Sequence, residues 1–302
     1  MELSNQTYTS EFFFMGLEYV PDLHSLILKL FLFLYLITIM GNLLIILAVS
    51  IDSHLHTPMY IFLCNLSFTD ICTSTMTVPK LLLNIQAHDK SISYIGFLSQ
   101  VYSCLLTVMA YDRYVAICQP LRYTIIMNPF LCILLVLLSM LISIINALLH
   151  TLLLLPLSFC TEQDVSNFFC ELGLVTKLAC SDTFINIIFI YTATIIFSII
   201  PLTGIIFSYI QILSSVLKIP SVGERHKSFS TCGSHLSVVS LFYGTALGVY
   251  MSSSLSNSSS SNVTASVMYS VVPQILNSFI YSLGSKETKG ALRQFIIRII
   301  CF

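Results

Sequence analysis

Seven long apolar stretches constrain the fold of this sequence more than any other feature. Each approaches or exceeds the roughly 20 residues that an α-helix needs to cross the hydrocarbon core of a bilayer. The second and the sixth are the most polar, and their assignment depends partly on the pattern of the others. The stretches are residues 26–50, 59–83, 92–117, 131–156, 184–213, 233–254 and 263–283. We predict an all-α integral membrane protein, a bundle of seven transmembrane helices.

The composition supports this fold class and excludes an ordinary soluble domain. Hydrophobic residues make up 56% of the 302 residues and charged residues only 9%, against about 25% charged residues in soluble proteins. The net charge of −1 gives no reason to expect nucleic acid as a partner. Backbone groups in lipid must bond internally, and the short connectors favour a helical bundle over a barrel. The first apolar stretch lacks the flanks of a signal peptide, so we predict that it is retained.

The distribution of Lys and Arg predicts the orientation, because cytoplasmic loops carry the excess of positive charge. Nine basic residues fall in one set of connectors and four in the other. The larger set is Arg113, Arg122, Lys218, Arg225, Lys227, Lys286, Lys289, Arg293 and Arg298; the smaller is Lys29, Lys80, Lys90 and Lys177. We predict an extracellular N-terminus over 1–25, the bundle over 26–283 and a cytoplasmic tail over 284–302, in the plasma membrane.

Two further features agree with this orientation. Three of the glycosylation sequons would lie outside, at Asn5, Asn257 and Asn262, and we expect Asn5 to be modified because the other two lie close to the membrane. In the tail, apolar residues recur at helical spacing between basic ones, which predicts a short amphipathic helix on anionic lipid. Cys301 in that tail is a candidate for acylation.

Three cysteines share the long connector between the fourth and fifth stretches. Cys160, Cys170 and Cys180 would lie in an oxidising compartment, where disulfides form. Their ten-residue spacing does not resemble a zinc motif, so we expect no metal there.

Asp70 is the one carboxylate deep within a predicted span. An ionisable residue at such a position is costly and indicates a functional site. Two interpretations remain open and are compatible. Asp70 could be satisfied by neighbours such as Asn42 and Asn277, or it could form a hinge between helices that responds to protons or to a sodium ion. We expect no other cofactor.

Asp112, Arg113 and Tyr114 close the third span at the predicted cytoplasmic face. An adjacent acid and base could be a solvated anchor. Alternatively, the pair could hold the helix end in one state and release the Arg to a partner in another.

Several motifs, in order along the whole chain, resemble the olfactory receptor family of rhodopsin-like G-protein-coupled receptors. The similarity lies in Gly41-Asn42, LHTPMY from Leu55 to Tyr60, MAYDRYVAIC from Met109 to Cys118, Ser208-Tyr209, and KSFSTCGSHL from Lys227 to Leu236.

The resemblance implies a receptor for small, mostly apolar volatile ligands that activates a stimulatory, olfactory-type G protein and raises cyclic AMP. Arg113 would meet the G protein, and Tyr209 and Tyr281 would stabilise the open state. The odorant cavity would be lined by residues such as Ala193, Phe197, Tyr243, Leu247 and Tyr250. For any single one of these five, simple helix packing is the alternative role.

The chain also departs from the family pattern. The family usually has a Cys at position 97, where Phe97 stands, bonded to the residue that matches Cys170. The resemblance implies a Cys160–Cys180 pair, which leaves Cys170 without its family partner. The third span lacks about nine residues after Tyr102, or roughly 13 Å of helix; the missing segment normally faces the ligand and includes an acidic residue near Asp70.

Smaller departures are Met140 for Trp, Ser278 for Pro and Gly284 for Arg. They leave open the alternative of a non-signalling product of a decaying receptor gene. A transporter or channel would need more charges within the membrane than Asp70 alone. An enzyme is not expected, because Ser234 and His235 are consecutive and point about 100° apart on a helix.

Overall fold

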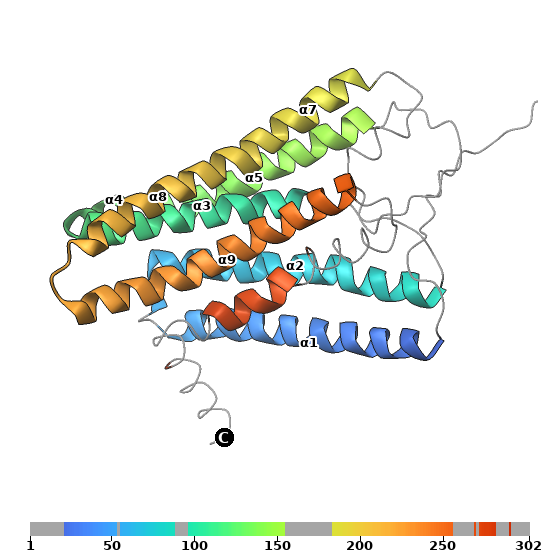
Figure 1. Ribbon diagram of the computed structural model, residues 1–302, viewed down its shortest axis with the longest axis horizontal. Helices are drawn as coiled ribbons and strands as arrows, with labels where there is room; N and C mark the ends of the chain where they lie inside the picture. The colour runs from blue at the N-terminus through green and yellow to red at the C-terminus, as the bar shows by residue number, and fades with distance from the viewer. Residues whose placement is uncertain are drawn as a thin grey trace, which may run out of the picture.

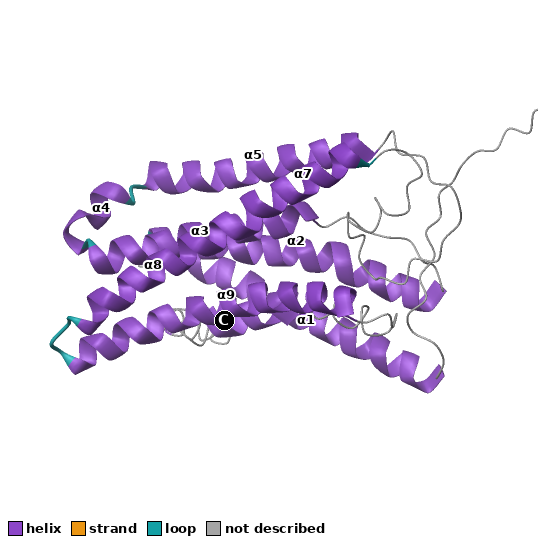
Figure 2. Cartoon of the chain, turned by 45° about the horizontal axis from the view of Figure 1, so that its top comes forward, coloured by secondary structure: helices purple, strands orange, loops and turns teal. Residues whose placement is uncertain are grey.

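The computed structural model describes residues 21–52, 55–87, 96–154 and 183–255, together with 269, 272–281 and 290. Within these residues the chain is helical and has no strand (Figure 2). The order is α1 Pro21–Ile51, α2 Pro58–Ala87, α3 Gly96–Cys118, η2 Pro120–Arg122, α4 Tyr123–Ile126, α5 Pro129–Leu154, α7 Phe184–Thr194, η3 Ile195–Ile199, α8 Ile200–Leu217 and α9 Val222–Leu255. Residues 272–281 form a further helical segment.

The predicted spans correspond closely to these helices. Six of the helical runs are long and apolar enough to cross a membrane: 28–51, 58–79, 98–118, 129–153, 184–217 and 228–249. The described part of the seventh stretch, 272–281, is helical and lies between α9 and α1 (Figure 1). The all-α membrane bundle is therefore confirmed.

Proline and polar residues set several helix starts. Pro58 and Pro129 occupy the first position of α2 and α5, where the missing N–H has no intrahelical partner to lose. Asn128 precedes α5, and its side-chain oxygen accepts a hydrogen bond from the Leu131 N–H at 2.8 Å, as an N-cap does. The end of the bundle that carries η2 and α4 is called the inner end below.

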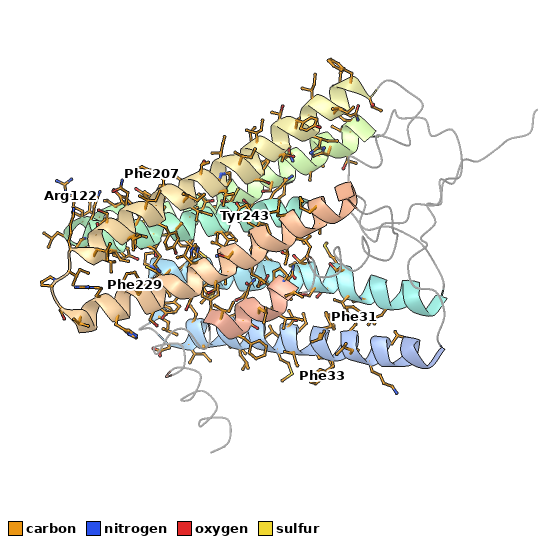
Figure 3. All side chains as sticks on the ribbon, viewed as in Figure 1. Phe31, Phe33, Arg122, Phe207, Phe229 and Tyr243 are labelled. Atoms are coloured by element: carbon orange, nitrogen blue, oxygen red, sulfur yellow. The ribbon has the colours of Figure 1, made fainter. Side chains whose placement is uncertain are left out.

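The centre of the bundle is formed by α2 and α3. In their membrane windows 56% and 50% of residues are buried, against 17 to 28% in the other four spans. Phe62, Leu66 and Leu106 are fully buried in this core. On the periphery, Phe33 of α1 and Phe207 of α8 project away from the bundle (Figure 3). The apolar exterior is what a helix bundle in lipid requires.

A π-helical turn, η3, interrupts the long run from Phe184 to Leu217. The cause follows from Pro201, which has no N–H and whose ring clashes with the carbonyl four residues earlier. That carbonyl belongs to Phe197. Ser103 of α3 donates to it at 2.7 Å and so replaces the missing backbone donor. A π-bulge of this kind often lies at a functional site.

The helical segment 272–281 packs closely on α1. A Cβ atom added to Gly41 would lie 2.8 Å from Oγ and 3.1 Å from Cβ of Ser278. Asn42, the next residue, donates to the backbone oxygens of Thr38 at 3.0 Å and Gln274 at 3.5 Å. Glycine at position 41 allows this approach without displacing the Ser278 side chain.

Candidate functional site

The inner end of α3 holds the acid and base that the sequence singles out. Asp112 is buried, with 1% of its surface exposed, and its Oδ1 accepts a hydrogen bond from the hydroxyl of Tyr123 at 2.8 Å. Burial and the negative charge of Asp112 raise the pKa of Tyr123 above its usual value. The phenol therefore stays protonated at neutral pH and remains a donor.

Arg113 has a different environment from Asp112. Its side chain is half-buried, and among the residues that the structure describes no ion pair with Asp112 occurs. The partner of the acid is the phenol of Tyr123 and not the adjacent guanidinium. Of the two interpretations left open for Asp112 and Arg113, the structure shows neither a solvated acid nor a described ion pair of the two, because Asp112 is buried and bonded to Tyr123, which joins α3 and α4. Tyr123 was not predicted from the sequence as the partner of Asp112. The two residues are eleven positions apart in different helices, so helical periodicity does not bring them together.

A second inner contact joins α8 and α9. The hydroxyl of Tyr209 lies 2.7 Å from Nδ1 of His235, and the two rings stack with centroids 5.8 Å apart. His235 is only 2% exposed. Ser234 donates instead to the Ser230 carbonyl of its own helix, at 3.4 Å. The geometry agrees with the expectation that Ser234 and His235 do not act as a nucleophile and base.

Tyr281, the other predicted stabiliser of the open state, is buried at 6% exposure. Its hydroxyl has no hydrogen-bond partner among the described residues. A buried hydroxyl without a partner is costly, so a rearrangement that gives Tyr281 a partner would recover that free energy.

A buried polar cluster lies in the middle of the bundle. Asp70 of α2 and Asn277 of segment 272–281 are each 1% exposed. The Asn277 Nδ2 donates to both oxygens of Asp70, at 3.1 and 3.4 Å, and also contacts the hydroxyl of Tyr102 on α3. The predicted neighbour Asn277 is therefore confirmed, whereas Asn42 bonds to backbone oxygens. Tyr102 was not predicted to belong here.

An aromatic and hydroxyl group connects this cluster with η3. The ring of Tyr102 stacks on Phe242 of α9 at 4.6 Å, and Phe242 meets Tyr243 edge to face at 5.2 Å. The Tyr243 hydroxyl points toward α3 (Figure 3) and lies 2.9 Å from Oγ of Ser103. Because Ser103 gives its one proton to the Phe197 carbonyl, Tyr243 is the donor to Ser103. Tyr102 and Ser103, which are consecutive in α3, thus connect this helix with η3, α9 and segment 272–281.

The residues predicted to line the odorant cavity differ in their burial and contacts. Phe197 and Tyr243 are brought together through Ser103. Ala193 is buried at 8% exposure, one turn before Phe197, whereas Leu247 is 62% exposed. The Tyr250 side chain lies outside the described part of the structure.

Several other predicted features also fall outside the described residues. They are Asn5, the cysteines Cys160, Cys170 and Cys180, the side chain of Phe97, and the tail apart from Gly290. The glycosylation site, the disulfide pairing and the amphipathic helix therefore stay predictions.

Comparison with known proteins gives a uniform result. A family model described as olfactory receptor matches residues 31–301. Human olfactory receptor 7G2 is 58% identical over 318 residues, covering 100% of this chain and 98% of that receptor. Human olfactory receptors 7C1 and 7G3 are each 54% identical over 311 residues, covering 100% of this chain and 97% and 100% of theirs. These two alignments have nine positions more than the 302 residues of this chain. The difference agrees with a chain about nine residues shorter than these two relatives over the aligned region.

Proposed function

Because this chain belongs to the olfactory receptor family, we propose that its inner end activates a stimulatory, olfactory-type G protein and raises cyclic AMP. The chain is an odorant receptor and not an enzyme. The type of G protein is inferred, and the ligands are proposed to be small volatile molecules, mostly apolar. The proposed location is the plasma membrane, with the N-terminus outside and the inner end in the cytoplasm.

One observation carries this proposal: Asp112 is held by Tyr123, which leaves the adjacent Arg113 without an ion pair among the described residues. A cation at the inner end of α3 suits the helix C-terminus of a partner, whose carbonyl groups favour positive charge. The turn beside it presents apolar side chains, because Leu121 is 95% exposed and Ile125 is 74% exposed. An exposed apolar patch of this kind supports a protein partner.

Two tyrosines at the inner end also support a two-state mechanism, in which we propose that the described conformation is the closed one. Tyr209 is engaged by His235, and the Tyr281 hydroxyl has no partner among the described residues. We propose that the open state releases Tyr209 from His235 and lets Tyr209 and Tyr281 stabilise Arg113. A ligand drives that change only to the extent that it binds the open state more tightly.

The odorant site is proposed to lie beside η3, with Ala193, Phe197 and Tyr243 in its wall. These residues offer apolar surface and one hydroxyl, which is typical of pockets for oily ligands. Leu247 and Tyr250 belong to the proposal as residues further along α9. Lipid is proposed to cover the exposed apolar side chains, such as Phe33 and Phe207.

A cyclic-AMP reporter in cells supplied with olfactory chaperones tests the proposal. We expect a broad odorant panel to produce a response that is weak in size, saturable with dose and abolished by Arg113→Ala. Lys29→Ala, which removes an exposed charge near the other end of α1, is the control and should leave the response intact. A saturable response that survives Arg113→Ala would contradict the proposed role of the inner end.

A further inference from the structure

The cluster around Asp70 is the part of the molecule where a sodium ion was expected. A hard cation in a protein needs several oxygen ligands with lone pairs directed at it. In a low-dielectric interior it also needs a negative charge to offset the loss of hydration. Asp70 is the only carboxylate in the middle of the described bundle, so any such ion would have to lie against its oxygens.

Both of those oxygens already face a donor. The Asn277 Nδ2 lies 3.1 Å from Oδ2 and 3.4 Å from Oδ1 of Asp70, and its protons present the positive end of the amide dipole. The same nitrogen contacts the Tyr102 hydroxyl. A cation placed between the carboxylate and the phenol would meet these amide protons, which repel it.

The side chain of Tyr102 cannot easily move aside. It is 3% exposed, and its ring is stacked on Phe242 at 4.6 Å with the planes 28° apart. Phe242 is itself held between Tyr243 and Tyr269. Swinging the phenol out would therefore break a packed aromatic group and leave a void, and voids in a close-packed interior are costly.

We infer that the Asn277 amide, together with the Tyr102 phenol that it contacts, takes the place of a cation beside Asp70, so that this receptor does not bind sodium there and its stability does not depend on sodium. The Asn277 amide donates to the carboxylate from a side chain of the protein itself, and the Tyr102 phenol fills the space beside that amide. The inference concerns ion binding and does not depend on which G protein the chain activates.

Other buried oxygens near the cluster do not change this conclusion. Oδ1 of Asn42, Oδ1 of Asn277 and Oε1 of Gln274 have no hydrogen-bond partner among the described residues. Amide oxygens can be neutral ligands of a cation, but the ion would still need the charge of Asp70 beside it. Both oxygens of Asp70 already face the Asn277 amide.

Thermal unfolding of the purified full chain in lipid nanodiscs tests the inference. The two buffers contain about 150 mM sodium chloride or choline chloride, which keeps the ionic strength equal. We expect the unfolding midpoints of the unaltered chain to agree within about 1 °C. Tyr102→Ser, which opens the space beside Asp70, should acquire a sodium-dependent rise of about 2 °C or more. Tyr102→Ser with no rise would show that Tyr102 is not the group that excludes the ion.

Tyr102→Phe and direct ion binding serve as further measurements if the Ser variant does not fold. The Phe ring still fills the space, so this variant should remain insensitive to sodium, and a sodium-dependent midpoint would count against the inference. Radioactive sodium should show no saturable binding to the unaltered protein. Saturable binding that disappears in Asp70→Asn would overturn the inference, whatever the cyclic-AMP assay shows.

Discussion

At the scale of single residues, the hydroxyl of Tyr123 decides how the acid at the end of α3 is satisfied. Asp112 is almost completely buried and takes its one described hydrogen bond from Tyr123. Tyr123→Phe would remove that donor while keeping the ring. A buried carboxylate without a donor costs about 1–3 kcal/mol, which disfavours the closed inner end.

We therefore expect Tyr123→Phe to raise basal cyclic AMP at equal surface expression and to lower the unfolding midpoint. Tyr114→Phe is the matched control, because Tyr114 is a half-buried neighbour on α3 for which the structure gives a ring contact with Tyr111 and no bond to Asp112. Equal basal signalling in the Tyr123→Phe and unaltered chains would show that this hydrogen bond does not hold the inner end closed.

Gly41 gives a second prediction at this scale. A methyl group there would lie 2.8 Å from Oγ of Ser278, and overpacking of this kind typically costs about 1–3 kcal/mol. We expect Gly41→Ala to lower the unfolding midpoint of the purified chain and the fraction that reaches the cell surface. Gly248→Ala, where a Cβ meets nothing within 4 Å, should be close to neutral.

The double variant Gly41→Ala with Ser278→Gly removes the atoms that the methyl group would meet. It should recover part of the stability lost in Gly41→Ala, since neighbouring substitutions couple. If the double variant lost the sum of the stabilities lost in the two single variants, the close approach of α1 to segment 272–281 would not be the cause of the instability of Gly41→Ala.

At the scale of elements, α3 is joined to η3 and α9 by the hydroxyl of Ser103. Ser103→Ala would leave the Phe197 carbonyl without the donor that Pro201 cannot supply, and would also deprive Tyr243 of its acceptor. The expected loss of stability is about 1–3 kcal/mol, with a smaller maximal response to any active odorant. Ser237→Ala is the control, because Ser237 is exposed and its hydroxyl donates to the Gly233 carbonyl of its own helix. A Ser103→Ala chain as stable as this control would show that η3 does not need the donor.

The length of α3 gives another prediction. This helix has 23 residues, against 30 in α2 and 34 in α9, and α2 continues past the Gly96 end of α3 (Figure 1). We expect a nine-residue family-like insert after Tyr102, combined with Phe97→Cys, to give a much larger cyclic-AMP response to an odorant panel than the unaltered chain. A scrambled insert of the same length is the control. A full response from the unaltered chain would remove the reason to regard its signalling as impaired.

At the scale of the whole molecule, the proposed orientation rests on nine basic residues in one set of connectors and four in the other. Tags on both termini, stained in intact and permeabilised cells, should show the N-terminus outside and the C-terminus inside. Asn5→Gln should remove a glycosidase-sensitive mobility shift. A C-terminal tag that is accessible in intact cells would contradict the seven-span orientation.

Much of the fold could be predicted from the sequence, because membrane helices require long apolar runs that are visible without any alignment. Most helix bounds differ from the predicted ones by five residues or fewer. The exception is α9, which begins eleven residues before the predicted 233, because a polar inner section from Val222 precedes the apolar window. The contacts of the site were harder to predict. Asn277 was expected beside Asp70, but Tyr102, Ser103, Tyr123 and His235 act through partners on other helices, and periodicity within one helix carries no information on such pairs.

The short third helix also affects which membrane suits this receptor. Its apolar window has 21 residues, or about 31 Å of helix. The endoplasmic reticulum bilayer is about 27 Å thick and the plasma membrane about 32–33 Å. A span that is shorter than the thicker bilayer must thin it locally or draw polar ends into lipid, at a cost of a fraction of a kcal/mol per Å. At about 31 Å the window falls only about 1–2 Å short of the plasma membrane, whereas it exceeds the endoplasmic reticulum bilayer by about 4 Å. Membrane thickness is therefore compatible with the proposed location at the cell surface, even for the short third helix.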